Sequence, residues 1–477
     1  MSKRPIYFGL GVACLALAIT SCKTPLLVGR TTANRAVPGS YQAIQDSLNS
    51  GKLRWREFFT DPYLTALIDT AIGNNQELNI SLQEIQIAQN DIRARTGEYL
   101  PFVGLQAGVG VDKVGQYTRP GSIEESNEIR PGRRFPTPLP DFLLGANASW
   151  QVDIWNKLHN AKRAAAVRYL SSIEGRNFTV TNLVAEIASS YYELLGLDSQ
   201  LDIVKKNIAI QNNALAIVRT EKEAARVTEL AVRRFEAQVL HTQSLQYDIQ
   251  QRIVETENRI NFRLGRFPQP VQRSSPDFNA LIPLAMHAGI PAQLLQNRPD
   301  IRQAERELEA AKLDVQVARA NFLPSLELSA TVGFNAYNPA LLLNPESLLY
   351  SLVGGLTRPL VNRNSIKAMY YSANARQIQS IYKYEQTILN AYIEVANQLS
   401  SINNLQKRYE LKARQVEALI QSITISNTLF RSARADYMEV LLTQRDALES
   451  RFDLVETKVQ QLNAVVNTYR ALGGGWN

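Results

Sequence analysis

The sequence predicts a mainly helical fold that also contains membrane-type β-strands, in which a helix, two strands and a long helical hairpin occur twice. Two long tracts lack the usual helix breakers: 141–267 contains no proline, and 360–472 contains neither proline nor glycine. Along both tracts apolar residues recur every seven positions, a spacing typical of coiled-coil packing. Before each tract the apolar period changes to two, which indicates strands.

The N-terminal segment has the pattern of an export signal. Two basic residues precede an apolar run that is shorter than a membrane-spanning helix needs, and small residues follow it. The run ends in Ile-Thr-Ser-Cys, which resembles a bacterial lipobox and makes Cys22 the expected lipidated residue. We expect a signal peptide at 1–21 and a lipidated tether at 22–61. The alternative is an ordinary cleaved signal with a coincidental cysteine.

An internal repeat organises the rest of the chain. Segments 85–101 and 308–324 share alanine, aspartate, an aromatic residue and Leu-Pro in register. Each copy opens with a proline at an expected first helical position, Pro62 and Pro299, because that position needs no backbone N–H. The copies close with Leu-Gly. The predicted segments are a first repeat at 62–265, an equatorial linker at 266–298 and a second repeat at 299–473.

The long tracts are expected to fold as helical hairpins. A single unbroken helix over one tract would be roughly 170 Å long at 1.5 Å per residue, so we expect turns near 225–228 and 433–436. The expected helices lie at about 62–98, 156–223 and 228–264 in the first repeat and at about 299–321, 363–432 and 436–472 in the second.

Apolar heptad positions support these hairpins, although a soluble coiled-coil dimer would carry the same pattern. The first stripe comprises Ile173, Val180, Ile187, Leu194, Leu201, Ile208 and Leu215. The second comprises Ile388, Val395, Ile402, Tyr409, Val416, Ile423 and Phe430. The second return helix adds Leu441, Leu448, Val455, Leu462 and Tyr469.

Four alternating segments are the expected strands, at about 100–112, 143–154, 323–336 and 348–358. Each has about the nine to eleven residues that a tilted strand needs to cross a bilayer. One face is apolar and the other is small or polar, as in a membrane barrel, although a half-buried soluble sheet would show the same alternation.

Four strands cannot close a membrane barrel, because about eight is the minimum and open edges in lipid leave backbone groups unsatisfied. Two chains would give eight strands with an interior filled by side chains, whereas three would give twelve strands and a lumen. Three chains would also bring enough helical rods to close a tube. The expected assembly is a trimeric 12-stranded β-barrel continued by an α-helical barrel of about 100 Å.

The chain resembles the outer-membrane factor family typified by TolC, and within it the lipidated OprM/NodT branch. The duplication and several short motifs carry the resemblance: Asn74-Asn75-Gln76-Glu77-Leu78, Leu100-Pro101, Trp150-Gln151-Val152-Asp153-Ile154, Arg298-Pro299-Asp300-Ile301, Leu323-Pro324 and Asp436-Tyr437-Met438-Glu439-Val440-Leu441. The resemblance implies a homotrimer in the bacterial outer membrane that extends into the periplasm and exports solutes. It also implies docking by a periplasmic adaptor to an inner-membrane pump.

The same resemblance assigns roles at the hairpin turns. Relatives commonly place glycine in each turn, where this chain has Ala225 and Ala433. The adaptor-docking candidates around them are Arg226, Val227, Arg434 and Ala435. An ordinary turn without a docking role is the alternative.

The resemblance also places a periplasmic gate just after the second turn. Its candidate residues are Met438, Glu439 and Leu442. At the position of Leu442 many relatives carry aspartate. Three symmetry-related carboxylates in a narrow bore would repel each other and attract blocking cations. Helix packing by Met438 and Leu442 is the alternative.

The predicted function is a passive trimeric duct of a tripartite RND-type system that exports drugs or other small solutes. The alternatives are the outlet of a type I protein secretion system and a non-conducting, lipid-anchored coiled-coil scaffold. The sequence carries no HExxH, GxSxG or phosphate-binding glycine loop, so we predict no catalytic residues, cofactor or metal site. The formal net charge of +8 is spread along the chain, which argues against nucleic-acid binding.

Overall fold

The computed structural model describes residues 24–27, 29–41, 48–274, 278–359, 361, 363–432 and 434–476. Cys22 and the expected signal peptide lie outside the described residues, as does Ala433. Within the described residues the expected order of a helix, two strands and a long hairpin occurs twice, so the predicted fold class is confirmed.

The first repeat begins with two helices where the sequence predicted one. The helix expected at 62–98 is divided into α3 (Pro62–Asn74) and α4 (Gln76–Tyr99). Asn75 between them has an extended backbone, and its side-chain oxygen accepts a hydrogen bond from the backbone N–H of Leu78 at 3.0 Å. Asn75 therefore caps α4, and a cap is what separates the two helices.

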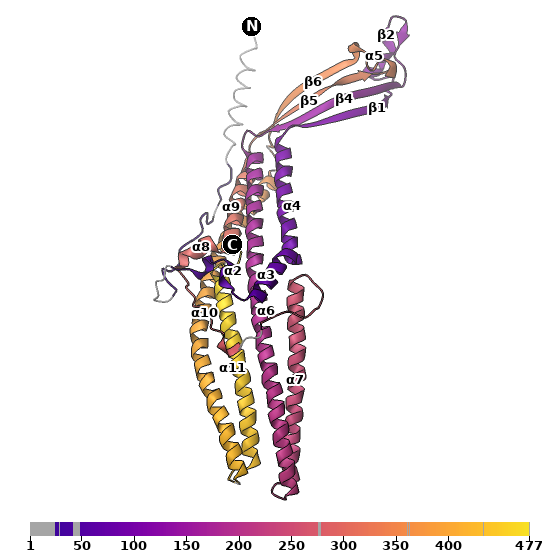
Figure 1. The fold of residues 1–477 in the computed structure, drawn as a ribbon. Coiled ribbons are helices and arrows are strands. Elements are labelled where there is room, and N and C mark those ends of the chain that lie inside the picture. Colours follow the sequence, from indigo (N-terminus) through magenta and orange to yellow (C-terminus); the bar gives the residue numbers. More distant parts are fainter. Residues whose placement is uncertain are drawn as a thin grey trace. The chain divides into compact units, whose positions relative to one another are not determined.

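The four long strands form one antiparallel sheet in the order β1-β4-β5-β6. Their bounds are Phe102–Asp112, Leu139–Val152, Ser325–Ala336 and Leu348–Thr357. The second strand therefore begins four residues earlier than the predicted 143 and ends at Val152. Figure 1 shows the four strands as one curved sheet.

The register of the sheet puts apolar and polar side chains on opposite faces. Leu105 pairs with Ala146, which pairs with Val332, which pairs with Tyr350. The neighbouring row on the other face runs through Gly104, Asn147, Thr331 and Ser351. Paired residues of an antiparallel sheet share a face, so the alternation seen in the sequence gives one continuous apolar surface. Its largest side chains are solvent-exposed in the single chain.

The polar loop expected between the first two strands contains regular structure of its own. It holds the short helix α5 (Arg119–Ser126) and a hairpin formed by β2 (Glu128–Arg130) and β3 (Arg133–Arg134). The shorter loop between β5 and β6 contains only two single-turn 3-10 helices, η4 (Pro339–Leu341) and η5 (Pro345–Ser347).

Two helical hairpins make up most of the chain. They are α6 (Lys157–Glu223) with α7 (Glu229–Arg263), and α10 (Asn364–Arg431) with α11 (Tyr437–Ala471). None of the heptad-stripe residues is exposed. No described helix has an apolar run long enough to cross a membrane.

Shorter elements complete the fold. The second repeat begins with α9 (Pro299–Ala320), preceded by α8 (Leu294–Asn297) and η3 (Pro291–Gln293) in the linker. The linker also holds η2 (Phe278–Ala280), and the segment before the first repeat holds η1 (Ser50–Lys52) and α2 (Trp55–Phe58).

The chain divides into two compact units that cut across the two repeats. The first comprises 1–32, 86–170 and 306–382 and contains the sheet. In it, the indole N–H of Trp150 donates to the carbonyl of Tyr99 at 3.0 Å, and that of Trp155 donates to the carbonyl of Pro324 at 2.7 Å. These bonds tie strand ends to helix ends within the unit.

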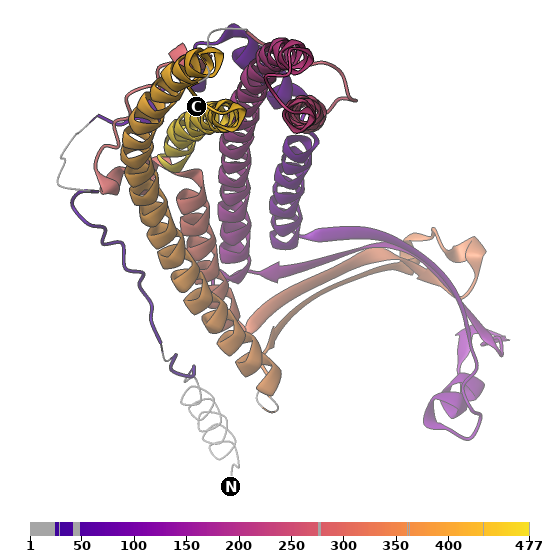
Figure 2. The ribbon, with the colours of Figure 1, turned by 90° about the horizontal axis from the view of Figure 1, so that it is seen from below.

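The second unit comprises 33–85, 171–305 and 383–477 and contains both hairpins. Figures 1 and 2 show its four long helices in the order α10, α11, α6, α7. Its main apolar core joins α2 and α3 to α6, α7 and α11. At its centre the ring of Tyr469 stacks on Phe58, with ring centroids 4.0 Å apart, and its hydroxyl donates to the carbonyl of Leu53 at 2.7 Å.

Candidate docking and gating site

The first hairpin turn is a left-handed helix cap built on an alanine. Ala225 has φ +55°, a conformation that an L-residue other than glycine rarely adopts. The backbone N–H of Arg226 donates to the carbonyl of Glu221 at 2.9 Å, and that of Ala225 donates to Lys222 at 3.0 Å. This pair of bonds is the Schellman motif, which commonly uses glycine at the left-handed position. The glycine-type geometry is therefore kept by Ala225.

The side chains of the first turn face two ways. Arg226 is exposed and forms no ion pair with any described residue. Val227 is half-buried and packs against an apolar cluster that includes Leu215 and Phe235. Of the candidates at this turn, the arginine is available to a partner and the valine holds the turn onto its own hairpin.

An ion-pair network that the sequence analysis did not single out joins the two helices across this turn. Lys222 Nζ lies 3.1 Å from Glu229 Oε2, and Arg233 Nε lies 3.0 Å from Glu229 Oε1. The hydrogen bond and charge of Lys222, with those of Arg233, hold the pKa of the Glu229 carboxyl below its usual value. The (i, i+4) spacing of Glu229 and Arg233 is the signal that could have found half of this network.

The second turn repeats one bond of the first. The backbone N–H of Arg434 donates to the carbonyl of Leu429 at 2.9 Å, the same five-residue span as in the first turn. Arg434 is exposed, forms no ion pair within the described part of the chain, and is followed by the half-buried Ala435. Each turn thus presents one exposed arginine.

The gate candidates occupy the first turn and a half of α11. Glu439 and Leu442 are exposed, whereas their neighbours Val440 and Leu441 are buried. Leu441 packs against the first hairpin, so Glu439 and Leu442 lie on the opposite, uncovered side of the helix.

Met438 has a different environment from the other two gate candidates. It is half-buried, and a guanidinium nitrogen of Arg234 in α7 lies 2.6 Å from its sulfur. Arg234 itself is exposed. This contact joins the start of the second return helix to the first hairpin, and nothing in the sequence spacing predicted it.

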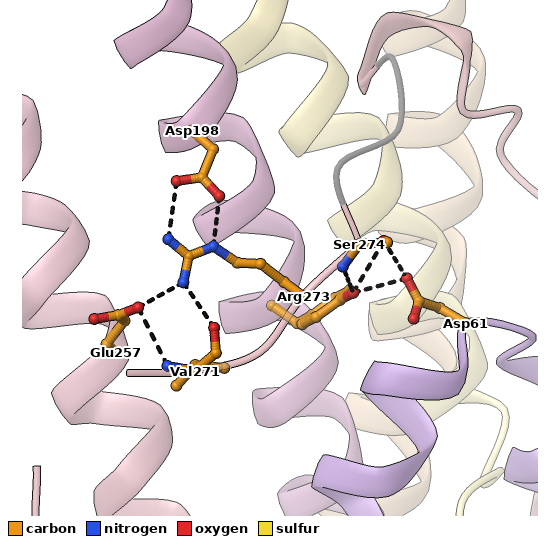
Figure 3. A network of polar contacts seen from close by, with 7 residues as sticks. Asp61, Asp198, Glu257, Val271, Arg273 and Ser274 are labelled. Atoms are coloured by element: carbon orange, nitrogen blue, oxygen red, sulfur yellow. Dashed lines mark hydrogen bonds and ion pairs between the residues drawn. The ribbon is translucent and has the colours of Figure 1, made fainter. Parts of the chain in front are cut away.

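Farther along the hairpins, the linker is fastened to α6 and α7 by a polar network (Figure 3). Arg273 reaches both Asp198 of α6, at 3.0 Å through Nη2, and Glu257 of α7. Asp61 accepts hydrogen bonds from the hydroxyls of Tyr191 at 2.7 Å and Ser274 at 2.8 Å. This network holds one linker segment against the first hairpin.

A second anchor is Arg298, which lies in one of the motifs that carry the family resemblance. Its guanidinium is buried and contacts Asp300 and Glu394 at 2.8 Å each, and it donates to the carbonyl of Ala471 at 2.8 Å. Burial opposes its charge, but the two carboxylates raise the pKa of Arg298 above its usual value. As a permanent cation, Arg298 therefore joins the start of the second repeat to α10 and to the end of α11.

Comparison with known proteins agrees with this architecture. A model of the family described as "Outer membrane efflux protein" matches residues 67–266 and 290–474. The cation efflux system protein CusC of Escherichia coli O6:H1 is 27% identical over 97% of this chain and 98% of its own length. The pyoverdine export outer membrane protein OpmQ of Pseudomonas aeruginosa is 28% identical over 97% and 96%.

Solved structures share the fold. The outer-membrane channel OprN superposes with a TM-score of 0.82 at 24% identity, covering 95% of this chain and 99% of OprN. The open state of the Neisseria gonorrhoeae MtrE outer membrane channel gives 0.81 at 20% identity, covering 95% and 99%. Because the family model matches most of the sequence, the chain belongs to the outer membrane efflux protein family.

Proposed function

We propose that the chain is the outer-membrane channel of a three-component pump, assembled as a homotrimer and joined by a periplasmic adaptor to an RND-type inner-membrane pump. The observation that carries the proposal is that the chain has edge strands without a second pairing partner and edge helices with an uncovered apolar face. Edge strands β1 and β6 each pair on one side only. Edge helices α7 and α10 expose large apolar side chains, among them Leu240, Tyr247, Leu389 and Leu411.

Edges of this kind are best satisfied by further copies of the same chain. When two different edges meet, the interface is head-to-tail and repeats around a ring. Three copies would supply twelve strands, enough to close a barrel with a lumen. They would also cover the exposed apolar residues of α7 with those of α10 from the next copy.

The channel alone does not determine which solutes are exported. Relatives are named for cation efflux, solvent efflux and pyoverdine export, although their channel chains align over nearly their whole length. We infer that the duct itself is permissive and that the inner-membrane partner selects the cargo. These names favour efflux of small solutes over protein secretion, and the family assignment favours a channel over a non-conducting scaffold.

Arg226 and Arg434 are the proposed adaptor contacts, with Ala225, Val227, Ala433 and Ala435 shaping the turns that present them. Their exposure and lack of ion pairs in the described chain support this role. Charge reversal at both arginines should abolish drug resistance in cells while leaving trimer assembly and outer-membrane location intact. The matched control reverses two exposed arginines elsewhere on the hairpins, Arg252 and Arg414, and should retain resistance. Full resistance in the Arg226→Glu/Arg434→Glu double variant would refute the docking assignment.

For the gate, Glu439 is the proposed acidic ring, with Met438 and Leu442 as its apolar neighbours. Three carboxylates in a narrow bore would bind cations that impede conduction. In planar-bilayer recordings, Glu439→Ala should weaken block by divalent cations at least several-fold, whereas Glu449→Ala, also exposed on α11, should not. Unchanged block in Glu439→Ala would remove Glu439 from the ring.

Cys22 is proposed to anchor the tether in the outer membrane through its lipid.

A further inference from the structure

A cavity of about 460 Å³ lies in the second unit between the linker and the helices α10 and α11. This volume falls within the range of small-molecule sites. Its walls are mainly apolar and include Leu281 and Met286 from the linker, Ile402 and Tyr409 from α10, and Val465 from α11. Glu410 lines it from an exposed position.

A buried lysine stands in this apolar wall. Lys458 is only 4% exposed, and its ammonium lies 4.6 Å from the centroid of the Tyr409 ring. No carboxylate of the described residues lies within ion-pair distance of it, and burial lowers its pKa. A π face stabilises a buried ammonium much less than a paired anion would, so among the described residues the Lys458 ammonium has no directly paired counter-charge.

A second buried polar group lies one helical turn farther along the same wall. Gln461 is 7% exposed, and its Nε2 donates to the carbonyl of Leu405 at 3.1 Å. Its Oε1 is buried and has no hydrogen-bond partner in the described chain. Leaving such an acceptor unmet costs about 1–3 kcal/mol, so a donor at this point would be favoured.

We propose that this cavity binds a small amphiphilic hydroxy acid, with its carboxylate on Lys458, its hydroxyl donating to Gln461 Oε1, and its apolar chain between the linker and Ile402. The assignment follows from the three features together. The cation selects an anion, the orphan acceptor selects a hydroxyl, and the apolar wall selects a hydrocarbon chain. The site is separate from the hairpin turns, and its occupancy does not depend on the proposed pump.

The test is calorimetric titration of the purified full-length protein, held in amphipol so that no detergent competes, with 3-hydroxydodecanoate. We expect saturable binding with one site per chain. Dodecanoate should bind several-fold more weakly because it lacks the hydroxyl, and dodecanol should bind at least tenfold more weakly because it lacks the charge.

Two variants assign the contacts. Lys458→Met keeps the length of the side chain but removes the charge, and should weaken binding of 3-hydroxydodecanoate at least tenfold. Because it also removes a buried ammonium, it should fold at least as stably as the parent, which circular dichroism would verify. Gln461→Leu should abolish the preference for the hydroxy acid over dodecanoate. The matched control Lys407→Met, at an exposed position on α10, should bind as the parent does.

Three outcomes would overturn the proposal. They are the absence of saturable binding to the parent protein, equal binding of dodecanol and the acid, and undiminished binding by Lys458→Met. The second outcome would mean simple hydrophobic partition, and the third would place the acid elsewhere on the molecule.

Discussion

Helices α7 and α11 are equivalent in the duplicated plan but occupy different environments. Both are 35 residues long, and both lead into a Leu-Gly pair, at Leu264 and at Leu472. Residues can therefore be matched one to one along the two helices. Leu240 of α7 is 60% exposed, whereas its counterpart Leu448 of α11 is 5% exposed. Tyr247 is 70% exposed and its counterpart Val455 is 1% exposed.

The difference teaches that one apolar stripe can serve two purposes. In α11 the stripe is buried by the chain itself, between α10 and α6. In α7 the matching stripe is exposed at the edge of the row, where the next copy would cover it in the proposed trimer. Folding and assembly thus draw on the same heptad pattern, and the position of the helix in the row decides which one it serves.

The largest expected effect tests that division directly. Leu448→Asp puts a charge in the interior and should prevent stable folding, because an unpaired buried carboxylate costs several kcal/mol. Leu240→Asp should leave the chain folded but unable to form the trimer. Circular dichroism would measure folding, and light scattering after gel filtration would measure assembly. Folded monomers of Leu448→Asp, or intact trimers of Leu240→Asp, would break the comparison.

A smaller effect is expected from a buried charge of the second repeat. Arg298→Met removes a buried cation but leaves Asp300 and Glu394 in place, so it should destabilise the fold by about 3–5 kcal/mol. Thermal unfolding would measure this loss. Arg445→Met, which breaks only the exposed pair with Asp446, is the control and should cost less than about 1 kcal/mol. Equal losses of stability in the two variants would show that burial does not determine how much these ion pairs contribute to stability.

The smallest expected effect concerns the turn that joins an interior helix to an edge helix. Ala225→Gly should stabilise the protein by about 1 kcal/mol, because glycine adopts the observed positive φ without strain. The same change at Ala216, an exposed position inside α6, should destabilise by about 1 kcal/mol. Thermal unfolding of the two variants would sharpen the comparison, and shifts of the same sign would show that the turn is not strained.

The sequence predicted the hairpins and the sheet because their signals are local and repeated. The heptad stripes of α6, α10 and α11, the expected turns and the closing Leu-Gly pairs located all four long helices to within one residue at each end, and alternation located the strands. The break at Asn75 was missed although Gly73-Asn74-Asn75 marks a helix end followed by a cap. Apolar residues continue at helical spacing on both sides of this signal, so the pattern predicts one helix.

The functional features were less predictable because they depend on neighbours that are distant in sequence. Leu240 and Leu448 have the same residue type and the same repeat position, so nothing local tells which is buried. The exposure of Arg226 and Arg434 follows from turn residues that the sequence did indicate. The contact of Arg234 with Met438 and the unmet groups Lys458 and Gln461 arise only when α7, α10, α11 and the linker come together.

The two unlike edges have a genetic consequence. In the proposed head-to-tail ring, a chain with one defective interface can still bind a neighbour through its intact interface. It is therefore incorporated and prevents the ring from closing. If a cell made parent and Leu240→Asp chains in equal amounts, random mixing would leave only about one ring in eight free of the variant. Such an allele would be dominant.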